Sequence, residues 1–198
     1  MKSTISKGTY RAMYRLLDRV SPIDGDCGKL CGAACCTCDY TPEDIEYVSD
    51  GDVNASDYMG LFLLPGEEQV YEGEDTSWLD WGHLMAEEYD YPESWEGKVY
   101  FLQCKTPPVC NRKLRPIQCR TFPLAPHIDE YGVFHIIKDK DEYPYECPLT
   151  GDMDIQEDFV KATYTVWKHL IRDPYICDLV LMDSEYRLEC GIEIQVLI

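Results

Sequence analysis

Five of the chain's eleven cysteines lie within the twelve residues 27–38. Core packing does not explain so dense a group, whereas thiolates two to four residues apart can bind one metal ion at sulfur–metal distances of about 2.3 Å. More cysteines follow far along the chain, and a metal that joined both groups would link distant segments. The sequence therefore predicts a metal site with these candidate ligands: Cys27, Cys31, Cys35, Cys36, Cys104, Cys110, Cys119 and Cys147.

These candidates outnumber the four thiolates that one tetrahedral ion takes. Either two ions bind, or several of the cysteines only surround the site. The adjacent Cys35 and Cys36 would point to opposite faces of a regular strand, so they are not expected to bind one ion from such a strand. Cys38 is as compatible with packing as with ligation. Cys177 and Cys190 have apolar neighbours in the sequence and are predicted to belong to the core.

The spacing of the cysteines bears on the identity of the metal. Zinc favours a closed tetrahedron of thiolates. Iron–sulfur clusters also take four thiolates, and their bacterial spacings include C-x2-C-x2-C runs. The first three cysteines form a C-x3-C-x3-C run, which departs from that pattern and also differs by one residue from the C-x3-C-x2-C loop of radical chemistry on S-adenosylmethionine. Zinc is therefore the first expectation, with an iron–sulfur cluster as the alternative.

The cysteine motifs resemble those of a known family. The run from Cys27 to Cys36, then Cys104, Cys110 and the segment 115–124 (RPIQCRTFPL), is similar to the YkgJ-type cysteine cluster proteins, described as zinc- or iron-chelating CxxCxxCC proteins. Cys147 with the two residues after it resembles a further piece seen in some relatives. This resemblance covers residues 27–149 and implies metal chelation. The same region also resembles part of the flagellin lysine methylases, which implies an iron–sulfur cluster and an enzymatic use.

Other residues near the motifs have two interpretations each. Arg115 and Arg120 flank Cys119, where they could offset the negative charge of thiolates or form ordinary salt bridges in an acidic protein. His127 could supply a nitrogen ligand or act as a base for a nucleophilic cysteine, but a lone histidine there is more often an ordinary hydrogen-bonded residue. The sequence contains no phosphate-binding glycine loop, no dinucleotide fingerprint and no H-E-x-x-H motif.

Charge and composition exclude several classes of partner. The chain has 37 acidic and 18 basic residues, a formal charge of −19, and this field would repel both nucleic acid and anionic lipid. Residues 1–20 lack the apolar core of a secretory signal, and no stretch has the length of a membrane span. We therefore expect a cytoplasmic protein whose cysteines bind metal rather than form disulfides.

The hydrophobic pattern predicts an α+β fold, rich in irregular structure, with all 198 residues in a single domain. Residues 155–198, a helix and a last strand, follow the part that carries the motifs. A helix start is expected at 41–44 and an acidic loop at 49–57, while 78–89 is compatible with a helix or an irregular loop. Strands are predicted over 60–64, 98–103, 132–137 and 191–198, and helices over 4–20, after 65–66 and over 155–171.

Three functions are compatible with these features. The first is a cytoplasmic cysteine-cluster protein that binds zinc or iron, with the ion holding the fold or being carried. The second is an iron–sulfur enzyme or redox protein, so enzymatic activity is left open. The third is an acidic interaction module, because residues 72–97 combine carboxylates with aromatic side chains that could meet a basic partner. The packing of these aromatic residues over the metal domain is the simpler interpretation.

Overall fold

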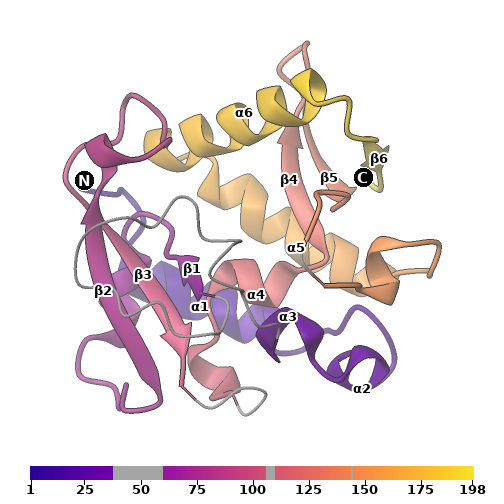
Figure 1. Cartoon of the computed structure of the whole chain (residues 1–198), viewed down its shortest axis with the longest axis horizontal. Helices are drawn as coiled ribbons and strands as arrows, with labels where there is room; N and C mark the ends of the chain where they lie inside the picture. Colours follow the sequence, from indigo (N-terminus) through magenta and orange to yellow (C-terminus); the bar gives the residue numbers. More distant parts are fainter. Residues whose placement is uncertain (38–59, 106–109, 144) are drawn as a thin grey trace.

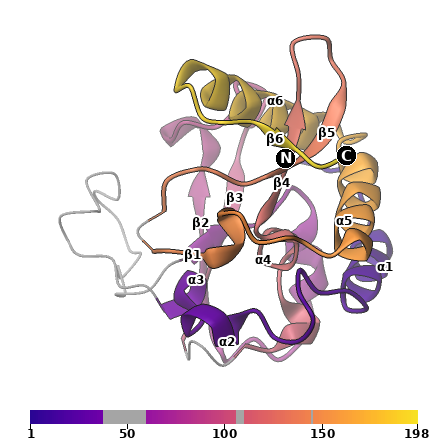
Figure 2. The ribbon, with the colours of Figure 1, turned by 90° about the vertical axis from the view of Figure 1, so that its right-hand side faces the viewer.

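Two three-stranded antiparallel sheets, with helices packed around them, organise the chain (Figures 1 and 2). The computed structural model describes residues 1–37, 60–105, 110–143 and 145–198. This arrangement confirms the predicted α+β class. The expected helix start at 41–44 and the acidic loop at 49–57 lie outside the described residues.

Helix α1 (Lys7–Leu17) forms where the sequence predicts an amphipathic helix over 4–20. The Ser6 side chain accepts a hydrogen bond from the Thr9 amide and so satisfies one of the free N–H groups at the start of the helix. The buried side chains recur every three or four residues, which places them on one face against the core. They are Tyr10, Met13, Tyr14 and Leu17.

The first sheet has the order β1-β3-β2, with β3 (Lys98–Cys104) between β1 (Gly60–Phe62) and β2 (Leu79–Met85). The prediction of a strand over 98–103 is confirmed, and β1 occupies the first part of the predicted 60–64 strand. Gly60 is required in β1, because a Cβ there would lie 1.9 Å from the Phe101 ring. Cys104 ends β3 opposite Leu79.

Strand β2 corrects the expectation of a helix or irregular loop over 78–89. The strand is mostly exposed and lies at the edge of the sheet, so its sequence lacks the apolar–polar alternation of a half-buried strand. Hydrogen bonding to β3 along its whole length stabilises β2 as a strand, although its local sequence pattern does not predict one. The 3₁₀ helix η2 (Ala86–Glu88) follows directly.

The second sheet has the order β4-β5-β6. Strand β5 (Phe134–Lys138) confirms the prediction over 132–137, and the expected final strand is reduced to β6 (Gln195–Val196). Strand β4 (Leu124–Ile128) is not predicted by the sequence pattern, because it contains Pro126. Proline is tolerated in an edge strand, and β4 lies at the edge of this sheet.

Two C-terminal helices cover the second sheet, as Figure 1 shows. Helix α5 (Glu157–Leu170) confirms the prediction over 155–171. Helix α6 (Pro174–Glu189) is not among the predicted elements, because its apolar residues are spread around the helix. The buried carboxylate of Asp173 caps α6 by accepting from the amides of Tyr175 and Ile176, and it also accepts from Thr4 near the N-terminus.

The placement of the last two cysteines is partly as predicted. Cys177 is half-buried and packs against the main core. Cys190 is exposed, so the prediction of a core position is wrong: it lies at the C-cap of α6, where the chain turns away at Gly191. In the described part of the chain, no helix combines the length and apolarity needed to cross a membrane.

Candidate metal centre

Two very short helices carry three cysteines of the first group: α2 (Gly28–Cys31) carries Cys31, and α3 (Ala34–Thr37) carries Cys35 and Cys36. Cys27 caps α2 and Cys31 ends it, so these residues, four apart, lie on one side of the helix. Gly32 and Ala33 both have left-handed backbone conformations, with φ values of 66° and 61°. This reversal separates the Cys27 and Cys31 pair from the cysteines on α3.

Asp26 connects the first cysteine group to the second. One carboxylate oxygen accepts from the Gly28 amide at 3.2 Å, and the other pairs with Arg112 at 2.7 Å. Arg112 belongs to η3 (Arg112–Leu114), which lies between Cys110 and Cys119 in the chain. Two residues 86 positions apart are therefore tied by one ion pair, although both partners are well exposed and the pair alone contributes little stability.

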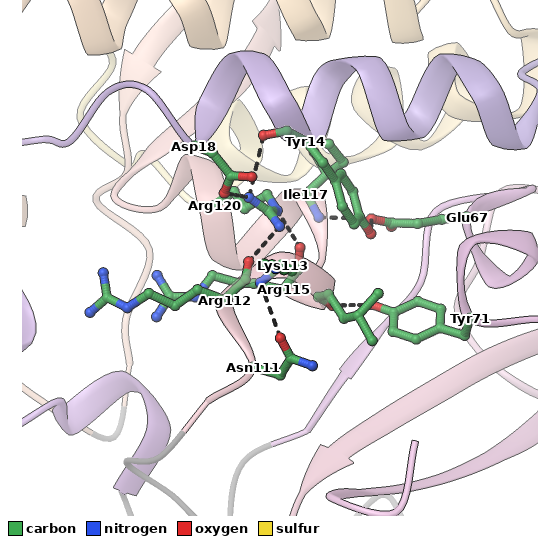
Figure 3. Close-up of polar contacts among 11 residues, drawn as sticks. Tyr14, Asp18, Glu67, Tyr71, Asn111, Arg112, Lys113, Arg115, Ile117 and Arg120 are labelled. Atoms are coloured by element: carbon green, nitrogen blue, oxygen red, sulfur yellow. Dashed lines mark hydrogen bonds and ion pairs between the residues drawn. The ribbon is translucent and has the colours of Figure 1, made fainter. Parts of the chain in front are cut away.

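Cys119 lies on α4 (Ile117–Thr121), and a buried carboxylate fixes the start of this helix. Glu67, in η1 (Glu67–Tyr71), accepts from the Ile117 amide at 2.8 Å and from the Tyr14 hydroxyl at 2.6 Å (Figure 3). It also accepts from the Leu64 amide at 3.2 Å. Burial raises the pKa of Glu67, and these three donors oppose that rise. The sequence gives no signal for this role, because Glu67 stands in an ordinary acidic turn.

The two arginines that flank Cys119 have different roles. The buried Arg120 donates to the carbonyl oxygens of Arg112 and Arg115, pairs with Asp18 and stacks 4.2 Å from the centre of the Tyr14 ring. It therefore holds the loop before α4 against α1. The side chains of Arg112 and Arg115 extend away from it in Figure 3.

Arg115 faces the thiols instead. Burial works against its charge, yet its pKa lies above the usual value because its side chain hydrogen-bonds to Cys110 and lies near Cys119 and Cys36. Of the two interpretations drawn from sequence, charge compensation fits Arg115, whereas structural pairing fits Arg120.

Cys147 precedes the short η4 turn (Pro148–Thr150), which is held in place by Lys138, the last residue of β5, and by Lys140 just after it. Lys138 donates from Nζ to the carbonyl oxygens of Gly151 and Met153, at 2.7 and 2.8 Å. Lys140 donates to the Thr150 carbonyl at 2.6 Å. Cys147 lies near Cys31 of α2 and lines the same cavity as Leu30 and Cys31.

One set of thiols surrounds Arg115. Burial and the nearby Cys36 raise the pKa of the Cys119 thiol. Burial, with the nearby Cys110 and Cys36, raises the pKa of Cys104 to about 11. The pKa of Cys36 is lowered instead, because its thiol shares a hydrogen bond with the Cys35 thiol 3.9 Å away, which favours the thiolate of Cys36.

A second set lies around α2. Burial raises the pKa of the Cys27 thiol; Arg115 opposes that rise, and Cys147 and Cys31 add to it. Burial likewise raises the pKa of Cys147, which lies near Cys31. Cys31 and Cys147 line one cavity of about 660 Å³, together with Asp141, Tyr143, Tyr145 and Glu146.

All eight predicted ligands therefore lie within electrostatic range of at least one other, although they come from four separate segments. As the side chains stand, no three cysteine, histidine or carboxylate groups among the described residues are placed to hold an ion. Cys38 lies outside those residues. The donors are soft thiolates beside one guanidinium, a set that suits zinc or an iron–sulfur cluster.

His127 lies apart from these groups. It is buried in β4. Burial and the nearby Arg187 lower the pKa of its imidazole below the usual value. The other ionisable side chains near it are His135 and Asp129. Its Nδ1 makes no hydrogen bond within the described residues. The structure thus places His127 among polar residues of the second sheet rather than among the cysteines.

In comparisons with family models, curated proteins and solved structures, nothing matches this chain. The resemblance to the YkgJ-type proteins therefore stays a prediction from short motifs, and function is argued from the site itself.

Proposed function

We propose that this chain is a metal-binding protein that holds zinc through cysteine thiolates and works in a reducing compartment, the cytoplasm. One observation carries the proposal. Thiols from three parts of the chain (Cys27 and Cys36, then Cys104, then Cys110 and Cys119) lie near the half-buried Arg115, although these parts share no sheet. Packing alone does not require that several ionisable thiols approach one another.

The energetics of the thiols support this function. Burial, with a further contribution from neighbouring thiols, raises the pKa of Cys119 and Cys104, so these two thiols resist ionisation when nothing is bound. A bound cation reverses this effect, because a coordinating thiol loses its proton outright. Metal binding would then release protons and tighten segments that have little packing of their own.

The test is the elemental content of the full chain, purified without air and without a nickel column. Stoichiometric zinc in a colourless protein supports the proposal. Replacing Cys119 with Ser should lower the metal content, whereas Cys177→Ser, in the half-buried position beside the core, should leave it unchanged. A chain that retains its circular dichroism yet binds neither zinc nor iron would contradict the proposal.

The iron–sulfur alternative has one observation in its favour. The cavity beside Cys31 and Cys147 would give a small molecule access to a cluster, as redox or radical chemistry requires. A brown protein that contains iron and acid-labile sulfide would replace the zinc proposal with this one.

The acidic interaction module has less support. In the stretch 72–97, Trp95 is buried in a small core cluster and stacks on Tyr91 with ring centres 5.1 Å apart. Trp78 is half-buried, and Trp81 is 43 % exposed. Most of these aromatic residues therefore pack within the protein, which favours the simpler interpretation made from the sequence.

A further inference from the structure

We propose that a second cavity, formed by α4, β4, α5 and α6, binds a small organic ammonium ion, with the carboxylate of Asp183 as its counterion. This α6 cavity has a volume of about 280 Å³. It shares Asp141 and Tyr143 with the cavity of Cys31 and Cys147, so the two adjoin. None of the described cysteines lines the α6 cavity, and this inference is therefore independent of the proposed metal binding.

The inner part of the α6 cavity is apolar. Leu124 from β4, Trp167 from α5 and Val180 from α6 line it, and each is at most 3 % exposed. Phe122 and Tyr143 add two rings that meet edge to face, with centres 5.6 Å apart. Apolar walls with a few polar groups are the usual composition of a small-molecule site. The volume lies just below the range of about 300–1,000 Å³ that drug-sized ligands occupy, so the ligand is small.

Most charged groups of the wall already have partners. Asp141 accepts from Arg187 through both oxygens, at 3.2 and 3.1 Å. The buried Asp139 accepts from the Tyr143 hydroxyl at 2.7 Å and from the Asp141 amide at 3.0 Å. Arg187 also donates to the Pro126 carbonyl oxygen at 3.3 Å. Because this guanidinium is engaged on both sides, the cavity offers no free cation to an anionic ligand.

Asp183 is the exception among these groups. Its carboxylate is half-buried in the wall, and among the described residues it has neither a hydrogen bond nor an ion pair. With Asp139 and Asp141 it makes three carboxylates against the one guanidinium of Arg187, a formal charge of −2 for the wall. A carboxylate removed from water without a donor costs stability. A cation in the cavity would supply the missing donor.

The surroundings of Asp183 favour an ammonium ion over a metal ion. Hard metal cations take six or more oxygen ligands, or keep several waters. Among the described residues, no three carboxylate, histidine or cysteine groups are placed to hold an ion. An ammonium group instead donates charge-assisted hydrogen bonds to one carboxylate, while the carbon atoms beside it pack on aromatic ring faces that also attract positive charge.

Isothermal titration of the full chain with benzylamine, which is cationic near pH 8, tests this inference. The wild type should bind about one equivalent, and benzyl alcohol, its neutral counterpart, should bind at least about tenfold more weakly. Asp183→Asn keeps the size of the side chain and should weaken benzylamine binding by a similar factor. Glu185→Gln, which removes an exposed charge from the same helix, is the matched control and should bind as the wild type does.

A third variant separates the cavity from general attraction to an acidic protein. Leu179→Trp narrows the α6 cavity without changing any charge, and it should also weaken the binding of benzylamine. Circular dichroism checks its fold, and Ala125→Leu takes its place if that fold is lost. Equal affinity of wild type and Asp183→Asn, or of benzylamine and benzyl alcohol, would overturn the proposal. A folded wild type that binds neither benzylamine nor the aliphatic butylamine would overturn it too, and the metal content of the protein would still decide the proposed function.

Discussion

The supporting network around Glu67 and the segments that carry the cysteines are built on opposite principles. In the network, the carboxylate of Glu67 and the guanidinium of Arg120 are buried and make several hydrogen bonds to protein groups. In the first cysteine group, Cys31, Cys35 and Cys36 lie on helices of four residues, which have almost no stability by themselves. Among the described residues, their thiols have no comparable set of hydrogen-bond partners, and Cys31 and Cys36 are half-buried.

The difference between the Glu67 network and the cysteine segments indicates which part of the chain needs a metal ion. The network joins α1, η1 and α4 through contacts that are complete without one. The cysteine segments are held from outside, by Asp26 on one side and by Lys138 and Lys140 on the other. We therefore expect the scaffold to fold without metal, and the cysteine segments to become rigid only when it binds.

The largest expected effect comes from breaking the scaffold. Glu67→Leu would leave the amides of Ile117 and Leu64 and the Tyr14 hydroxyl without their acceptor. At about 1–3 kcal/mol for each of these three buried groups, we expect the free energy of unfolding to fall by at least about 3 kcal/mol. Urea unfolding of the metal-free protein measures this change.

The matched control is the same substitution at the next position. Glu68 is only half-buried, and no other side chain donates a hydrogen bond to it among the described contacts. Glu68→Leu should therefore change the free energy of unfolding by less than about 1 kcal/mol. Equal losses at the two positions would show that the Glu67 network does not support the site.

The half-buried carboxylate of Asp183 sharpens the contrast, because no hydrogen bond like those to Glu67 is found for it among the described residues. Burial raises the pKa of Asp183 in α6 from its usual 3.8 to about 6, although Arg187 opposes the rise. The folded state thus binds this proton more tightly than the unfolded chain does. Ionisation of Asp183 reduces stability as the pH rises from about 4 to 6, and the loss is complete above that range.

Asp183→Asn removes this penalty. At 1.36 kcal/mol per pKa unit, the variant should be about 2–3 kcal/mol more stable than the wild type at pH 8, and no more stable near pH 4. Thermal or urea unfolding across this range measures the difference. Glu185→Gln, which removes one exposed charge on the same helix, controls for the general repulsion in an acidic protein. A gain at pH 8 that persisted at pH 4 would exclude the burial of Asp183 as its cause.

The smallest effect concerns the thiol side of the comparison. Arg115→Gln should weaken metal binding by about tenfold, because it removes the charge that offsets the thiolates beside Cys110. Arg115→Lys should restore part of the affinity. Competition with a chromogenic chelator measures the change. Arg11→Gln is the control, because Arg11 lies on α1 and this variant breaks only its exposed ion pair with Glu74. Unaltered affinity in Arg115→Gln would leave that residue without a role at the site.

The predicted elements that the structure confirms are those with a strong local signal. The amphipathic faces of α1 and α5 and the apolar run of β3 are visible in the sequence, because burial on one face imposes a period. Three elements are not predicted, each for its own reason. Strand β2 is exposed at a sheet edge, strand β4 contains a proline, and helix α6 has apolar residues on all sides. In each case, contacts with another element stabilise a strand or helix that the local sequence pattern does not predict.

For the site, the sequence alone determined which side chains could hold a metal, because thiol chemistry belongs to residue type and its clustering along the chain is visible in the letters. Only the tertiary structure decided how those residues are grouped and supported: that Arg115 faces the thiols while Arg120 faces α1, that Cys147 shares a cavity with Cys31, and that Glu67 fixes the start of the helix of Cys119. The physical reason is distance along the chain. Contacts between residues 50 or 100 positions apart depend on how whole elements pack, and no local spacing encodes them.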